Sequence, residues 1–266
     1  MIIDESCRYV SLTGNDIPTE LYSKIIELDS QVFAEGSDDY EADTSMPPEV
    51  LMSFLKKNIL TTTIIYDQIE DRVIGYYQAF PLKDDFLQKY VSGQTTFKEM
   101  TDDDVEKYVP TTQGQKLYIW SIGIDKEYRG KKIEDFPSSK LNGKSPVKIM
   151  VEALANAVIN LRKQGVKISE IYCEGVSDKG QALASDLTDG RLLHSDEEKD
   201  FLMYGNVFKF ENMVKRLPED VKNALIEKYN AVSGYSKTKL GDNMDRLVVD
   251  TAESEKLDKK RDENDI

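Results

Sequence analysis

The feature that most constrains the fold is a strand, a charged turn and a long helix that follow one another near the middle of the chain. KLYIWSIGID (116–125) is a nearly unbroken run of β-branched, aromatic and aliphatic residues, which predicts a buried strand. Apolar residues at helical spacing predict a helix over 147–164, and Ser145 and Pro146 supply an N-cap and a first-turn proline. SEIYCEGV (169–176) predicts a further strand, so this part of the chain indicates an α/β fold.

Strands and helices are also predicted on both sides of this unit. Strand patterns cover CRYVSL (7–12), TTTIIYDQ (61–68), RVIGYYQAF (72–80), RLLHS (191–195) and FLMYGNVFKF (201–210). Helical patterns begin at Thr19 (a candidate N-cap), Pro47, Asp178 and Pro218. Residues 83–115 are polar and irregular, and they predict an insertion or a surface excursion with a helix near 102–108.

Charge and composition exclude several classes of function. The 266 residues carry a formal net charge of −14, whereas nucleic-acid binding depends on clustered Lys and Arg. No apolar stretch is long enough to cross a membrane, and the start lacks the basic and apolar regions of a signal peptide. Cys7 and Cys173 are expected to be free thiols of a cytoplasmic protein. One histidine and two scattered cysteines offer no ligand cluster for a metal.

The turn after KLYIWSIGID concentrates positive charge in this acidic chain. It places Arg129, Gly130, Lys131 and Lys132 between a strand and a helix. Backbone N–H groups of such a turn, together with a helix N-terminus, form a typical anion site. The alternative is a solvated basic turn, since short motifs often occur by chance.

The order of elements and this turn together resemble the GNAT superfamily of N-acyltransferases over roughly residues 7–215. The resemblance is carried by KLYIWSIGID, KEYRG, IMVEALANAVINLRKQG and SEIYCEGV. The family's turn has the pattern Arg/Gln-x-x-Gly-x-Gly/Ala. Arg129 fits its first position, Lys132 and Glu134 replace its two small residues, and an insertion (135–147) separates the turn from the helix.

The resemblance implies a central mixed, mostly antiparallel sheet flanked by helices. The GNAT-like domain is expected over 1–217, with insertions at about 83–115 and 135–147. A C-terminal helix and a flexible charged tail are expected over 218–266. The implied activity is acyl-CoA-dependent transfer of an acetyl or similar acyl group to an amine of a small molecule or a protein. Acetyl-CoA or another acyl-CoA would be the co-substrate, and a homodimer is left open.

By resemblance, the central strand and its turn would bind the cofactor. Backbone groups of Ile122, Gly123 and Ile124 would pair with the pantetheine arm, and an N–H there would hold the developing oxyanion. Arg129, Gly130, Lys131 and Lys132 would bind the pyrophosphate. Gly123 also suits a β-bulge or a close ligand approach, and the alternative is packing against an aromatic neighbour such as Trp120.

Two residues of SEIYCEGV are the candidates for catalysis. Glu174 would take the proton of the amine. Tyr172 (on the same face of the strand), Tyr204 or water would give a proton to the departing thiolate. Asp186 falls where the family often has a tyrosine, and an ionised carboxylate cannot donate a proton. The alternative for Glu174 is a strand-end side chain that faces solvent.

Two interpretations of the whole chain remain open. One is the N-acyltransferase, in which the acidic connector AEGSDDYEAD (34–43) would attract a cationic acceptor. The other is a catalytically silent GNAT-like module that acts through protein–protein binding, with residues 83–115 and the tail helix as contact surfaces. The connector is also compatible with a solvated acidic loop.

Overall fold

The computed structural model describes residues 4–33, 47–175, 177–196 and 201–232. The chain divides into two units, 1–231 and 232–266. The helices and strands described here lie in the first unit. The acidic connector 34–43 and the charged tail from Thr251 lie outside the described residues.

Seven described strands form one sheet in the order β1-β2-β3-β4-β5-β7-β6. Their bounds are Tyr9–Thr13 (β1), Thr62–Asp67 (β2), Arg72–Pro81 (β3), Gln115–Ile124 (β4), Ile168–Gly175 (β5), Leu192–Asp196 (β6) and Phe201–Val207 (β7). Among these strands β4 and β5 are parallel, because a helix crosses between them, and every other neighbouring pair is antiparallel. The pairing confirms the expected class, a central mixed sheet that is mostly antiparallel.

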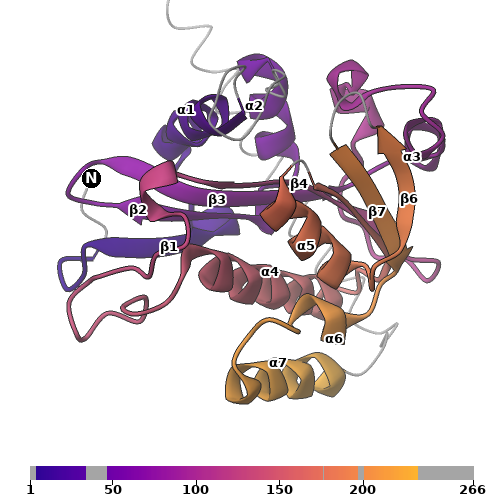
Figure 1. Cartoon of the computed structure of the whole chain (residues 1–266). Coiled ribbons are helices and arrows are strands. Elements are labelled where there is room, and N and C mark those ends of the chain that lie inside the picture. Colours follow the sequence, from indigo (N-terminus) through magenta and orange to yellow (C-terminus); the bar gives the residue numbers. More distant parts are fainter. Residues whose placement is uncertain (1–3, 34–46, 176, 197–200, 233–266) are drawn as a thin grey trace, which may run out of the picture. The chain divides into compact units, whose positions relative to one another are not determined.

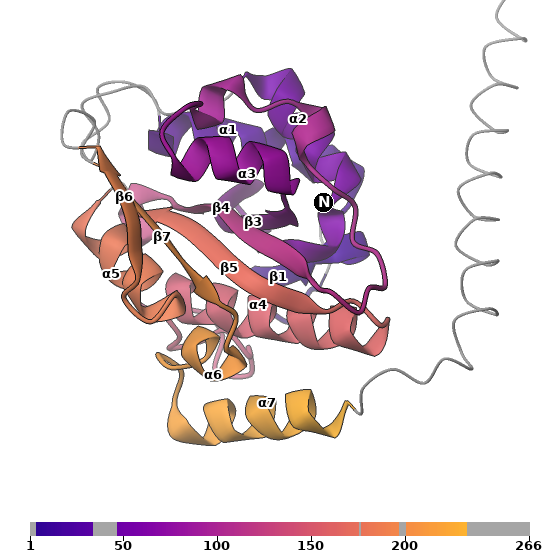
Figure 2. The ribbon, with the colours of Figure 1, turned by 90° about the vertical axis from the view of Figure 1, so that its right-hand side faces the viewer.

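Helices cover both faces of this sheet (Figures 1 and 2). Their bounds are Tyr22–Phe33 (α1), Pro48–Lys57 (α2), Asp84–Val91 (α3), Pro146–Lys163 (α4), Asp178–Leu187 (α5), Phe210–Met213 (α6) and Glu219–Ala231 (α7). Figure 1 shows α1 and α2 above the strands and α4 below them. β4 is interior, β5 lies next to it and α4 packs on the sheet, which is the arrangement that the resemblance to the GNAT superfamily implies.

The long helix α4 follows the sequence prediction closely. Pro146 occupies its first turn, and Met150, Leu154 and Leu161 are buried against the sheet. Gly165 follows the helix with φ +83°, a conformation that glycine adopts without strain. Local signals and the apolar stripe agree here, which is why the prediction succeeds.

Residues 83–115 differ from their prediction. The helix of this segment is α3, whereas the predicted helix near 102–108 is a short 3-10 turn at Asp102–Asp104 followed by extended chain. Phe86 and Tyr90 on α3 are buried and pack with Phe80 and Tyr118 of the sheet. The segment therefore contributes buried core residues, which its polar composition did not predict.

The predicted tail helix is present as α7 and packs on α4 and α6. The ring of Tyr229 stacks on Phe210 with centroids 4.2 Å apart, and the guanidinium of Arg162 lies 4.4 Å from the centre of the same ring. The side chain of Leu225, which belongs to α7, is buried. The short helix α6, which carries Phe210, has no clear sequence signal.

No helix in the described part of the chain is both long and apolar enough to cross a membrane.

Candidate active site

β4 and β5 separate halfway along their length. Their register runs from Gln115 opposite Ile168 to Ile119 opposite Cys173, and it ends there. On its other side β4 continues to pair with β3, with one extra residue, Trp120, at a register shift. Such a bulge bends a strand. The bulge lies at Trp120 and not at Gly123, the residue that the sequence favoured for it.

A cleft of about 740 Å³ opens where the two strands part. Its walls include α1 from one face of the sheet and α4 and α5 from the other face. The cleft therefore passes through the gap between β4 and β5. Its volume is in the range of small-molecule and cofactor sites.

One end of the cleft is built to attract an anion. Arg129 and Gly130 line it, together with Val147 in the first turn of α4 and Lys179 in the first turn of α5. The first N–H groups of a helix have no partner within the helix and carry partial positive charge. Asp178 also lines this end, so the end carries negative as well as positive side chains.

A hydrogen bond from Arg129 to the last residue of β4 helps to hold the turn in place. Arg129 Nε donates to the carbonyl of Ile124 at 2.8 Å. Gly130 has φ +73°, and a Cβ added there would have no atom within 4 Å, so the backbone is open to a ligand. The side chains of Lys131 and Lys132 are exposed and do not line the cleft.

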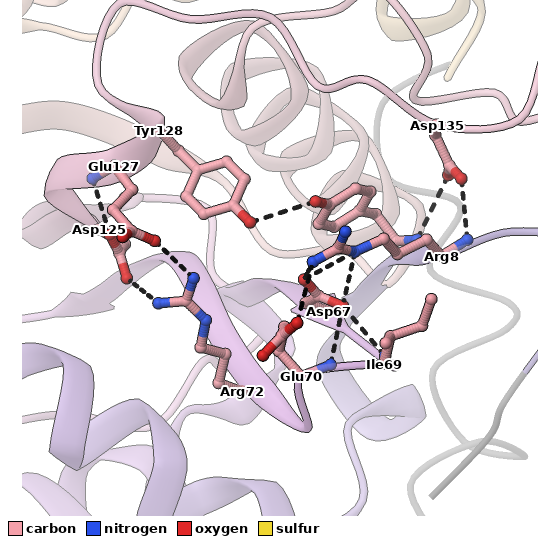
Figure 3. A network of polar contacts seen from close by, with 10 residues as sticks. Arg8, Asp67, Ile69, Glu70, Arg72, Asp125, Glu127, Tyr128 and Asp135 are labelled. Carbon is pink, nitrogen blue, oxygen red and sulfur yellow. Dashed lines mark hydrogen bonds and ion pairs between the residues drawn. The ribbon is translucent and has the colours of Figure 1, made fainter.

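A polar network anchors the start of this turn to the first three strands (Figure 3). Asp125 caps the turn by accepting from the N–H of Glu127 at 2.8 Å. Arg72 on β3 binds both carboxylates, at 2.6 Å to Asp125 and 2.7 Å to Glu127. Tyr128 Oη lies 3.1 Å from Tyr9 Oη on β1. These contacts fix the start of the turn to β3 and β1.

The predicted insertion 135–147 is anchored to β1 as well. The carboxylate of Asp135 accepts from the N–H groups of Arg8 at 2.9 Å and Tyr9 at 3.3 Å (Figure 3). Ile133 is buried, and its N–H donates to the carbonyl of Lys144 at 2.8 Å, which closes the loop. Glu134 is exposed and does not line the cleft.

Glu174 lines the cleft where β5 parts from β4. Part of the residue reaches solvent, but its Oε1 is enclosed and has no hydrogen-bond partner among the described residues. Burial penalises the charged form and raises the pKa of Glu174 to about 8. A carboxyl group with this pKa exchanges protons near neutral pH, as a general base requires.

The structure does not bring Tyr172 and Asp186 to the cleft lining. Tyr172 shares the face of β5 with Glu174, as predicted, but its hydroxyl donates to Glu170. Asp186 is bound by Lys215 and Arg216 near α6. The residues of α5 that line the cleft include no tyrosine; they are Asp178, Lys179, Gly180, Gln181, Leu183, Ala184 and Leu187.

Sequence reasoning missed one polar group at the cleft. Asp29 on α1 is 3% exposed, and its Oδ1 accepts a short hydrogen bond from Tyr76 Oη. Tyr76 Oη also lies 2.8 Å from Ser121 Oγ, and both Asp29 and Ser121 line the cleft. The available signal was a carboxylate between Leu28 and Val32, in the apolar stripe of a predicted helix.

Within the described part of the chain, no cluster of three or more His, Cys, Asp and Glu residues could hold a metal ion.

No protein-family model matches this chain, and no curated protein matches it. Among solved structures, a polyamine N-acetyltransferase of Drosophila melanogaster is 12% identical, with 75% of this chain and 100% of that chain covered and a TM-score of 0.44. The NatC complex bound to Gag peptide and CoA is 15% identical, with 76% and 99% covered and a TM-score of 0.42. An agmatine N-acetyltransferase mutant is 12% identical, with 76% and 100% covered and a TM-score of 0.42. These likenesses are weak, and the site rests on this chain's own residues.

Proposed function

We propose that this chain is an acyl-CoA-dependent N-acyltransferase that moves an acetyl or similar acyl group to an amine. The observation that carries the proposal is the cleft through the gap between β4 and β5. One end has Arg129 and two helix N-termini, which suit phosphates, and Glu174 and Asp29 line the same cleft with carboxyl groups that suit an amine. A donor with phosphates and an acceptor with an amino group would meet in it.

The residues of the cleft fit an acyl-CoA. Gly130 leaves open space where a Cβ would stand, so phosphates can approach its backbone. Arg129 and the first turns of α4 and α5 would hold them, with Lys131 and Lys132 extending from the same turn. Beyond the bulge, Ile122 and Ile124 line the cleft. This part of β4 does not pair with β5, because their pairing ends at Ile119. Its backbone can pair with an extended ligand arm as it would with a strand.

When bound, the acyl thioester supplies an activated acyl group. Glu174 would accept the proton of an incoming ammonium, which leaves the amine neutral and nucleophilic. The amine nitrogen then forms a bond to the acyl carbon while the carbon–sulfur bond breaks. Water in the open cleft can carry the proton that the nitrogen then loses to the departing sulfur, so the proposal does not need Tyr172.

Thermal unfolding with acetyl-CoA tests the cofactor half of the proposal. A ligand at a hundred times its dissociation constant stabilises a protein by about 2.7 kcal/mol, so a rise in Tm is expected. Arg129→Glu should abolish the rise. Lys107→Glu makes the same change of charge at an exposed site outside the cleft and should leave the rise intact. No rise with acetyl-CoA, longer acyl-CoAs or free coenzyme A would refute it.

Mass spectrometry of a panel of amines with acetyl-CoA tests the catalytic half. Glu174→Gln should keep the rise in Tm and lose most of the turnover, because the base is removed and the cofactor contacts are not. If the wild-type chain binds acetyl-CoA and acylates no amine, the protein is a silent binding module. The side-chain position of Asp186, away from the cleft and bound by Lys215 and Arg216, favours that second candidate.

A further inference from the structure

Asp29 is a carboxylate placed where an apolar side chain would pack. The buried residues of α1 are Tyr22, Ile25, Leu28, Asp29 and Val32. Only 3% of Asp29 is exposed. Removing a carboxylate from water is costly unless it is both paired with a cation and hydrogen-bonded. A role for this charge is therefore needed to explain its position.

Among the residues that the structure describes, Asp29 has one hydroxyl partner and no cation. Its Oδ1 accepts from Tyr76, whose hydroxyl also contacts Ser121 at 2.8 Å. Among the described residues, no Lys or Arg forms an ion pair with Asp29, and no charged neighbour contributes to its pKa. Burial raises the pKa of Asp29 to about 6, and the Tyr76 hydrogen bond opposes that rise. The carboxyl group therefore lies against a hydroxyl, with no positive partner in the described part of the chain.

The missing cation can come from the cleft. Asp29 lines the cleft together with Glu174, whose Oε1 is enclosed and unpartnered among the described residues. The rings of Phe33, Phe97 and Trp120 line the same cleft. Aromatic faces attract cations, and an ammonium group has three N–H donors for carboxylate oxygens.

We propose that Asp29 selects the acceptor by binding it as a primary alkylammonium ion, so that the substrate class is cationic amines and not neutral nucleophiles. The inference rests on the proposed function for its catalytic meaning, since Glu174 would then take the proton of the bound ammonium. Asp29 acts by binding, and its carboxylate is held by the hydroxyl of Tyr76, which Ser121 contacts in turn.

Binding of two shape-matched probes in the absence of acyl-CoA tests the inference. The probes are 2-phenylethylammonium and the neutral 2-phenylethanol, titrated into the full chain and followed by calorimetry or ligand-detected NMR. A charge-assisted hydrogen bond predicts that the wild-type protein binds the ammonium more than about tenfold tighter. Asp29→Asn should bring the two dissociation constants together by weakening the ammonium alone.

Two further variants keep the test decisive. Asp85→Asn removes an equal charge from an exposed site on α3 outside the cleft and should leave the preference unchanged. Tyr76→Phe keeps the carboxylate but removes its hydrogen bond, and should reduce the preference even if Asp29→Asn does not fold. Equal binding of both probes by the wild type, or an unchanged preference in folded Asp29→Asn, would overturn the inference.

The outcome is separable from that of the proposed function. If acetyl-CoA raises Tm and the ammonium preference survives Asp29→Asn, the inference fails and the proposed function stands. If acetyl-CoA neither binds nor is consumed while the preference depends on Asp29, the cation site stands and the proposed function fails.

Discussion

Gly123 on β4 lies opposite Tyr76 on β3, and a Cβ added to Gly123 would lie 2.4 Å from Cε1 of the tyrosine ring. The missing side chain lets this ring lie flat across the strand. In that position its hydroxyl meets both Asp29 and Ser121. The sequence suggested this glycine for cofactor binding; in the structure it makes room for the ring whose hydroxyl donates to Asp29.

We expect Gly123→Ala to lower the free energy of unfolding by about 1–3 kcal/mol, because the added methyl group displaces the Tyr76 ring in a packed core. The same change should weaken ammonium binding. Gly130→Ala is the matched control: it places an alanine at φ +73° without a clash, which costs about 1 kcal/mol and should not alter ammonium binding. Urea unfolding and probe titration measure both effects, and a Gly123→Ala protein as stable as the wild type would contradict the argument.

Glu174 should make stability depend on pH. Burial raises its pKa in the folded protein to about 8, from the ordinary value of 4.5. Between these values the folded protein holds a proton that the unfolded chain loses, so the wild type loses stability as pH rises through this window. Glu174→Gln does not titrate. It should be similar to the wild type at about pH 4 and more stable by a few kcal/mol at about pH 8.5, as measured by urea unfolding.

The same group sets the expected pH profile of catalysis. Only the deprotonated carboxylate can accept the proton of the amine, so kcat/KM should rise with pH and level off above about 8. A profile that is flat from pH 6 to 9 (roughly the range in which the group titrates) would argue against Glu174 as the base.

Asp67 should contribute strongly to stability. Its side chain is fully buried, and it binds Arg8 at 2.6 Å and the N–H groups of Ile69 and Glu70 at 3.0 and 3.1 Å. Asp67→Ala leaves the arginine with only its longer ion pair to Glu70, at 3.6 Å, and two turn N–H groups without an acceptor, so we expect a loss of about 3 kcal/mol in urea unfolding. Glu219→Ala breaks an exposed pair with Lys222 and should change stability by less than about 0.5 kcal/mol. If the two changes lowered the free energy of unfolding equally, the prediction that the buried Asp67 contacts contribute more than an exposed ion pair would be wrong.

Helix α7 should unfold together with the sheet. Leu225→Ala removes a buried side chain at its contact with the rest of the unit and should cost about 2 kcal/mol. Asn223→Ala changes an exposed residue of the same helix and should have little effect. Differential scanning calorimetry would contradict this prediction if Leu225→Ala left the main transition unchanged.

Local patterns in the sequence determined most of the elements. The apolar run of β4, the stripe of α4 with Pro146 at its start, and the alternation that puts Tyr172 and Glu174 on one face of β5 all reappear in the structure. Each depends on spacing along one segment, which a single sequence displays. The sequence did not predict the core formed by residues 83–115. Phe86 and Tyr90 stand in a polar segment, and the residues on which they pack lie in other strands.

The candidate site divides in the same way. The sequence by itself identified Glu174 and the turn at Arg129 and Gly130, since both follow directly from strands with clear signals. Only the tertiary structure decided that Glu134 and Tyr172 do not line the cleft and that Asp29 does. Those outcomes depend on where β4 and β5 separate and on which side chains of α1 meet Tyr76. Contacts between segments far apart in the chain set both, and the periodicity of any one segment does not encode them.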